Sequence, residues 1–184
     1  KPEDVFNIGI DKLGQQDIRF AKEKNLKIKL IPTAKEIDGD KVVLYVLPRL
    51  VGKDSMLYNV ENENNGVLVK AAFADQQFFY GKGAGGHPTG SAVLSDIAAL
   101  RYGYRYEYKK HLESSTLNYS QDYLIKVYLR YTDDTLIEKL NFSEITERYY
   151  APDFKYVIGH INLQQIAAHK ADLDQEGNFI AEIA

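Results

Sequence analysis

Apolar and polar residues alternate along the first hundred residues with two different periods. In Leu26–Leu30 every second residue is apolar, which predicts a strand with one buried face. Val93, Ile97 and Leu100 recur at three- to four-residue spacing, which is typical of an amphipathic helix. The predicted elements are a helix over Asp11–Asn25, strands over Leu26–Leu30 and Lys41–Leu47 around a turn at Asp38-Gly39-Asp40, a helical turn over Asp54–Val60, a hairpin of Val67–Ala72 and Gln77–Tyr80, and a helix from Pro88 to Arg101.

The second half of the chain has the same mixed character. A tyrosine-rich connector, Tyr102–Tyr119, precedes it. Five further elements are then predicted: a strand over Tyr123–Tyr131, a helix over Asp134–Tyr149, a strand over Phe154–Leu163, a helix over Gln164–Asp172 and a short strand over Phe179–Ile183. The pattern predicts an α/β (α+β) fold with a mixed sheet, hairpins and packed helices. We expect one domain over residues 1–118 and a smaller one over residues 119–184.

Composition narrows the possible functions. The chain has 184 residues, 45% of them hydrophobic and 27% charged, as in an ordinary globular protein. It has no cysteine, which excludes disulfides, thiol catalysis and thiolate zinc sites. Its net charge of −3 gives no reason to expect nucleic acid or a membrane as a partner. The four histidines do not have the spacing of a metal site, and we expect no metal.

The N-terminal residues carry no pattern that would direct the protein to a particular cellular compartment. Lys1-Pro2-Glu3-Asp4 leads directly into a strand-like run rather than into a secretory signal, so we expect the cytoplasm. Because the chain does not begin with methionine, we also expect that it has been shortened, by design, processing or proteolysis.

The strongest chemical signal is the glycine-rich stretch Gly81–Gly86, between a predicted strand and a predicted helix. It fits G-x-G-x-x-G, and glycines let a backbone approach a ligand while a helix N-terminus favours an anion. Glu107 even lies at a suitable distance downstream. A dinucleotide-binding βαβ unit is still excluded, because the preceding strand belongs to a hairpin and no βαβ series follows. Two readings remain: a ligand loop, or a tight turn without a ligand.

The segment from Gly81 to Ile97 closely resembles the homoserine dehydrogenase pattern G-x-G-A-G-x-x-P-T-x-S-A-V-x-x-D-[IL]. Other pieces resemble that family in the same order along the chain: Gly9-Ile10, Asp17-Ile18 with Ala21, Lys27-Ile28-Lys29-Leu30 and Val46–Val51. The resemblance covers about Ile8–Leu100.

The resemblance implies an oxidoreductase of threonine, methionine and isoleucine biosynthesis that interconverts aspartate semialdehyde and homoserine with NADP or NAD. In that family a Rossmann domain holds most of the coenzyme, and the glycine loop closes over it. Carried over by position, Gly85 is the expected coenzyme contact, flanked by Gly83 and Ala84. The family's catalytic lysine and acid–lysine pair precede the matched segment. We therefore assign no catalytic residue, and we expect the chain alone to be inactive and to form a homo-oligomer, a dimer or larger.

Residues 119–184 resemble an ACT regulatory domain of βαββαβ type. ACT domains that bind amino acids carry Asp-x-Pro-Gly at the first strand–helix turn, whereas this turn reads Thr132-Asp133-Asp134-Thr135. The resemblance therefore predicts the fold and leaves effector binding open. The alternative function is a stand-alone regulatory or dimerisation module without catalysis.

Overall fold

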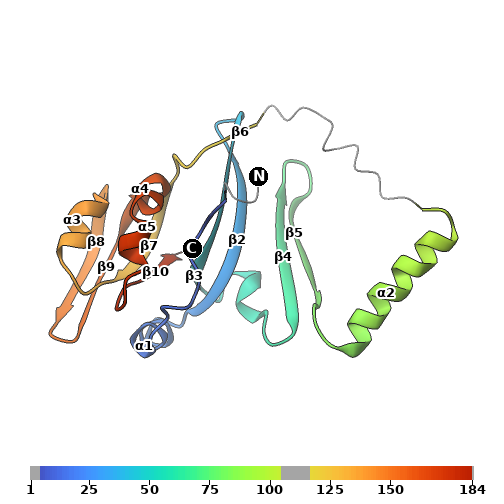
Figure 1. Cartoon of the computed structure of the whole chain (residues 1–184), viewed down its shortest axis with the longest axis horizontal. Coiled ribbons are helices and arrows are strands. Elements are labelled where there is room, and N and C mark those ends of the chain that lie inside the picture. The colour runs from blue at the N-terminus through green and yellow to red at the C-terminus, as the bar shows by residue number, and fades with distance from the viewer. Residues whose placement is uncertain (1–4, 105–116, 184) are drawn as a thin grey trace. The chain divides into compact units, whose positions relative to one another are not determined.

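The computed structural model describes residues 5–104 and 117–183, and the chain divides into two units (Figure 1). The larger unit combines residues 1–52 with residues 116–184, and the smaller unit spans residues 53–115. The predicted mixed α/β fold is confirmed. Most of the predicted connector Tyr102–Tyr119 lies outside the described residues.

Strand β3 (Lys41–Val51) pairs with more strands than any other described strand of the larger unit. One edge pairs antiparallel with β2 (Lys27–Ile37) along its whole length, from Lys27 opposite Val51 to Ile37 opposite Lys41. The predicted turn between them is confirmed, since Asp38 and Gly39 adopt φ of 56° and 76°. Both strands run longer than the sequence pattern predicted.

The other edge of β3 is shared by three short parallel strands. They are β6 (Asn118–Tyr119), β1 (Phe6–Asn7) and β10 (Phe179–Ile183). On this edge the carbonyl of Val46 accepts a hydrogen bond from the N–H of Ile8. Alternate residues of a strand point their backbone groups to the same edge, so the nitrogen of Pro48 also faces β1 and β10. Pro48 falls between the residues that pair with β1 and those that pair with β10, where a missing N–H costs no ladder bond.

The C-terminal segment has the order β–α–β–β–α–β. Its elements are β7 (Leu124–Arg130), α3 (Thr135–Leu140), β8 (Glu144–Ala151), β9 (Phe154–Asn162), α4 (Leu163–Ala168) with α5 (Lys170–Leu173), and β10. The strands lie in the order β10-β7-β9-β8 and each neighbouring pair is antiparallel. Because β10 also pairs with β3, this segment and the β2–β3 hairpin form one continuous sheet.

The helix predicted over Asp134–Tyr149 was wrong in its second half. The chain leaves the helix at Asn141, which takes the left-handed conformation (φ 47°), and residues 144–151 form the edge strand β8. Ile145, Tyr149 and Tyr150 favour a strand, and pairing with β9 outweighs the weak helical period. The predicted helix over Gln164–Asp172 is also divided, with a break at His169.

Helices cover both faces of this sheet. Leu140, Leu163 and Ile166, from α3 and α4, pack with strand residues such as Val127 and Val157 on one face. On the other face, α1 (Gln15–Glu23) places Phe20 and Ala21 in the second part of the core. The core residues of that second part are Phe20, Ala21, Leu50, Tyr128, Tyr156, Ile158, Phe179 and Ala181. The unit therefore has three layers.

A buried ion pair fastens α1 to the sheet. Asp17 is 1% exposed and accepts hydrogen bonds from Arg130 Nε at 2.9 Å, Tyr128 Oη at 2.8 Å and the N–H of Gly14 at 2.8 Å. The guanidinium of Arg130 also donates to the carbonyls of Lys12 and Gly177. Burial and the Asp17 carboxylate raise the pKa of Tyr128 well above its usual value, so it stays a donor. The resemblance had singled out Asp17 without indicating this role.

A second ion pair joins the N-terminal hairpin to the last strand. Arg49 on β3 lies 2.5 Å from the carboxylate of Glu182 on β10, with both side chains largely buried. Tyr45 Oη donates to the same carboxylate, and Thr33 Oγ1 accepts from Arg49 Nη2 at 2.8 Å. Together with the Asp17 pair, this contact joins residues 5–52 to residues 117–183 by charge as well as by backbone.

The smaller unit has no buried residue in its regular elements. It consists of the 3-10 turn η2 (Met56–Asn59), the hairpin of β4 (Asn64–Ala71) and β5 (Asp75–Lys82), and helix α2 (Gly86–Arg101). The predicted helical turn and hairpin are confirmed. Val67 and Phe79 lie opposite each other on one hairpin face and are 56% and 58% exposed. Leu100, in the predicted stripe of α2, is 69% exposed.

Within the part of the chain that the structure describes, no helix has both the length and the apolar character that crossing a membrane requires.

The Asp17–Arg130 pair yields a test of what holds the larger unit together. Asp17→Asn removes the negative charge and leaves the buried guanidinium unpaired, so the free energy of unfolding should fall by about 3–5 kcal/mol. Urea denaturation of the parent and the variant measures this. The matched control is Glu176→Gln, which removes the exposed partner of Lys12 (2.7 Å) and should leave stability unchanged within error. Equal effects of the two substitutions would contradict the assignment.

Candidate functional site

The glycine loop is shorter than predicted and begins inside the hairpin. Strand β5 continues to Lys82, and α2 begins at Gly86 with Gly85 as its N-cap. Gly85 has φ 113° and ψ 156°, a backbone conformation that favours glycine. Pro88 is the third residue of α2 rather than the first. It still lies in the first turn, where backbone N–H groups have no partner within the helix.

Two contacts from the start of β4 hold Gly83. Its N–H donates to the carbonyl of Glu63 at 2.8 Å. The side chain of Asn65 occupies the space beside its Cα, so that a Cβ on residue 83 would lie 1.9 Å from Asn65 Nδ2 and 2.5 Å from Cγ. A side chain at position 83 would therefore have to displace the exposed Asn65 carboxamide, whether or not a ligand is bound.

A shallow pocket of about 560 Å³ lies at the loop. Its lining residues are Glu63, Lys82, Ala84, Gly85, Gly86, His87, Pro88 and Ser91. Of the residues predicted to contact a coenzyme, Gly85 and Ala84 line the pocket. Gly83 is absent from the lining, and it lies against Asn65 instead. Sequence reasoning missed Glu63, because no motif marks an acid eighteen or more residues before a glycine loop.

The pocket contains an ion pair. Lys82 Nζ lies 3.0 Å from Glu63 Oε1. The backbone N–H of Glu63 itself, and then Lys82, hold the pKa of the Glu63 carboxyl below its usual value. The first turn of α2 follows directly, and its backbone N–H groups favour an anion. The pocket thus combines glycine backbone and a helix N-terminus, which suit a phosphate or another anionic group, with a Lys82–Glu63 pair whose charges balance.

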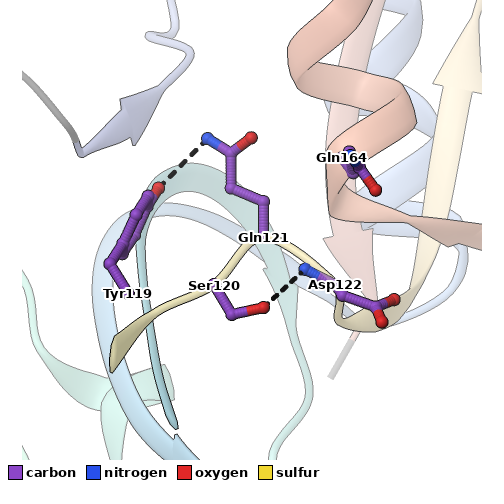
Figure 2. A pocket seen from close by; sticks show the side chains of 5 residues that line it. All are labelled: Tyr119, Ser120, Gln121, Asp122 and Gln164. Carbon is purple, nitrogen blue, oxygen red and sulfur yellow. Dashed lines mark hydrogen bonds between the residues drawn. The ribbon is translucent and has the colours of Figure 1, made fainter. Parts of the chain in front are cut away.

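A second hollow, of about 510 Å³, lies on the larger unit and is polar throughout (Figure 2). It is lined by Tyr119, Ser120, Gln121, Asp122 and Gln164. Gln121 Nε2 donates to Tyr119 Oη and Asp122 N–H donates to Ser120 Oγ, both at 3.1 Å. Asp122 Oδ1 also accepts from Asn162 Nδ2 at 2.6 Å. These bonds within the hollow are typical of a folded turn, and no group of catalytic residues converges there.

The turn at residues 132–135 is closed by its own chain. Asn178 Oδ1 accepts from the N–H of Thr132 at 3.2 Å, and Asp133 Oδ1 accepts from the N–H of Thr135 at 3.0 Å. Gly177, at φ 89°, packs so closely on Thr132 that a Cβ there would lie 2.5 Å from Thr132 Cγ2. The two N–H groups are therefore already paired inside the protein.

The comparisons with known proteins agree on one family. The family model for homoserine dehydrogenase matches residues 1–98, which is more than half of the chain. The chain belongs to the homoserine dehydrogenase family. The matched region includes β1, α1, the β2–β3 hairpin and the whole glycine loop, so the resemblance inferred from the sequence is confirmed.

Relatives match well beyond that region. Homoserine dehydrogenase from Bacillus subtilis is 34% identical over 132 residues, which are 66% of this chain and 30% of that protein. The enzyme from Synechocystis is 34% identical over 167 residues, which are 89% of this chain and 36% of that protein. The chain thus spans about a third of the length of these curated relatives.

Solved structures give the same fold. A homoserine dehydrogenase from Thiobacillus denitrificans matches with a TM-score of 0.71 at 22% identity, covering 100% of this chain and 48% of that one. A Staphylococcus aureus homoserine dehydrogenase at pH 7.0 matches with a TM-score of 0.60 at 25% identity and the same coverage. Both the order of elements and the mixed sheet described above are therefore those of this enzyme family.

Proposed function

We propose that the chain is the distal portion of an NAD(P)-dependent homoserine dehydrogenase, the enzyme that interconverts aspartate semialdehyde and homoserine. The observation that supports this most directly is the family match over residues 1–98, which ends within α2 and includes the whole loop. The glycine loop adds local chemistry that suits the activity, since its glycine backbone and the N-terminus of α2 favour an anionic ligand.

The coenzyme, NADP or NAD, supplies or accepts a hydride, and a Rossmann domain upstream of this chain would hold most of it. The residues present fit a contact with its phosphates. Gly85 has no side chain to keep a ligand away, and the loop turns into the N-terminus of α2, while Lys82 already pairs with Glu63. In this proposal the loop orients the bound coenzyme and excludes water from it, while proton transfer and substrate binding rest on upstream residues.

Residues 119–184 would then be an ACT-like regulatory domain. The order β7–α3–β8–β9–α4/α5–β10 and the strand order β10-β7-β9-β8 support this proposal. Effector binding at the turn of residues 132–135 is disfavoured, because Asn178 and Asp133 already pair two of its N–H groups. We therefore propose an ACT-like fold for this domain, without an effector bound at this turn.

A homo-oligomer, a dimer or larger, is proposed as the working form, and the cytoplasm as its location. The smaller unit supports the first point. A two-stranded hairpin is marginal in water on its own, and β4–β5 presents Val67, Val69 and Phe79 on one face. Such a face needs a partner to remove it from water.

A stand-alone regulatory or dimerisation module is the second candidate function. The observation that favours it is the βαββαβ order of β7 to β10, since a regulatory module needs only such a fold. The reading frame upstream of Lys1 discriminates between the two candidates, because only an enzyme needs a Rossmann pattern followed by an acid–lysine helix.

The first test of the function compares this polypeptide with the same polypeptide preceded by its upstream half. The chain alone should form no NADPH or NADH from homoserine, because positioning and acid–base assistance are both absent, and each contributes orders of magnitude in rate. The complete polypeptide should be active in the same spectrophotometric assay. Turnover by the chain alone, or inactivity of the complete form, would contradict the proposal.

The second test addresses the loop in the complete enzyme. Gly85→Val should weaken coenzyme binding strongly, because a side chain enters the pocket and because valine is strained at φ 113°. Gly90→Ala is the control. It lies inside α2 with no atom within 4 Å of its Cβ, and alanine favours the helix by about 1 kcal/mol. Coenzyme titration measures the affinity of both variants, and thermal melts measure their stability. Normal coenzyme binding by Gly85→Val would contradict the coenzyme contact and show that the loop is only a turn.

The third test concerns association. Sedimentation velocity of the purified chain at tens of micromolar should show a dimer or a larger species, driven by burial of the exposed hairpin face. Val67→Lys, in the centre of that face, should shift the profile towards the monomer. Lys70→Glu, a charge change at an exposed position of the same strand, is the control. A monomeric profile for the unmodified chain would count against the proposed oligomer.

A further inference from the structure

The loop that would close over the coenzyme has no tertiary core beneath it. No residue of β4, β5 or α2 is buried, so hydrophobic packing among the described residues of this unit cannot fix the conformation of residues 83–85. A loop that presents its backbone to a ligand must nevertheless be held in position, because ordering a loose loop on binding lowers the affinity for the ligand. Some other contact must therefore define the path of the loop.

The contacts that could do this converge on Gly83. Its N–H is held by the Glu63 carbonyl at 2.8 Å, and Lys82 next to it is held by the Glu63 carboxylate at 3.0 Å. Asn65 fills the remaining side, with its carboxamide where a Cβ of residue 83 would be. Glu63 directly precedes β4, and Asn65 is the second residue of that strand. Asn65 pairs with Gly81, near the end of β5.

We propose that Asn65, together with the carbonyl of Glu63, positions Gly83 and thereby sets the conformation of the coenzyme loop. Asn65 is a positioning residue, since it lies outside the pocket lining and acts through Gly83. The inference rests on the proposed function of the loop. It adds that the small volume at position 83 and the carboxamide at position 65 form a matched pair.

A matched pair predicts a specific form of non-additivity. In the complete enzyme, Asn65→Ala should raise the dissociation constant for NADPH or NADH about tenfold, because Gly83 loses its lateral support. Gly83→Ala should do the same or worse, because the new methyl group must displace the carboxamide. The double variant should bind better than Gly83→Ala alone, since the methyl group then occupies the space that the carboxamide has left.

Fluorescence titration with NADPH and with NADH measures all four forms, and kcat at saturating coenzyme should change little because the reacting groups lie elsewhere. Gln77→Ala is the matched control. It removes a carboxamide from the same hairpin face, four residue pairs along the register from Asn65, and should bind coenzyme normally. Thermal melts of the variants should stay close to that of the control, which separates positioning from a general loss of structure.

The outcomes separate this inference from the function on which it rests. Normal binding by Asn65→Ala, or a double variant no better than Gly83→Ala, overturns the positioning role when Gly85→Val still binds poorly. Normal binding by Gly85→Val as well shows that the loop does not contact the coenzyme, and both proposals then fall. Weak single variants with recovery in the double variant support the pairing of Asn65 with Gly83.

Discussion

Strand β3 is the constraint on which the larger unit depends, because segments from both ends of the chain hydrogen-bond to it. Its first edge is occupied by β2, and its second edge is divided among β6, β1 and β10. The parallel contact with β10 turns a hairpin and a βαββαβ segment into one sheet. Without that contact the two would be separate pieces, each with an exposed edge.

The two buried ion pairs lie across this junction. Arg49 and Glu182 join β3 to β10 side by side, and Arg130 joins β7 to α1 through Asp17. A buried charge is costly unless it is paired, so each pair penalises any arrangement in which the N-terminal and C-terminal segments separate. The ion pairs therefore specify which surfaces meet, while the apolar residues around them supply most of the stabilisation.

The smaller unit follows a different logic, since its own residues bury almost nothing. Its order comes from backbone pairing of β4 with β5 and from local contacts such as those at Gly83. Regions with few buried contacts open at low free-energy cost, and binding loops are commonly drawn from them. A loop of this kind suits a ligand that must enter and leave, provided that a few contacts define its closed path. Asn65 and Glu63 are the residues placed to do so.

Local sequence was enough wherever the decisive interaction is local. The strand over Leu26–Leu30, the Asp38-Gly39 turn and the end of the helix near Asn25 each depend on neighbouring residues, and all three are confirmed. The buried face expected for that strand is not, because Leu30 is 45% exposed. The family resemblance rested mainly on the glycine loop, which is also a local feature. At Gly85 the backbone takes a positive φ that favours glycine. Glycine permits this φ, but the place of Gly85 before a helix does not require it.

Only the tertiary structure decided the strand pairings and ion pairs between residues that are far apart in the sequence. Residues 144–149 have a weak helical period, yet β9 recruits them as an edge strand. Asp17 pairs with a residue 113 positions away, and β10 adds itself to β3, which no local pattern encodes. In the same way the sequence indicated that Gly83 belongs to a loop, but not that Asn65 fills its missing side chain. The sequence by itself determined the family and the local turns, and the fold decided which residues support them, because that depends on which surfaces meet.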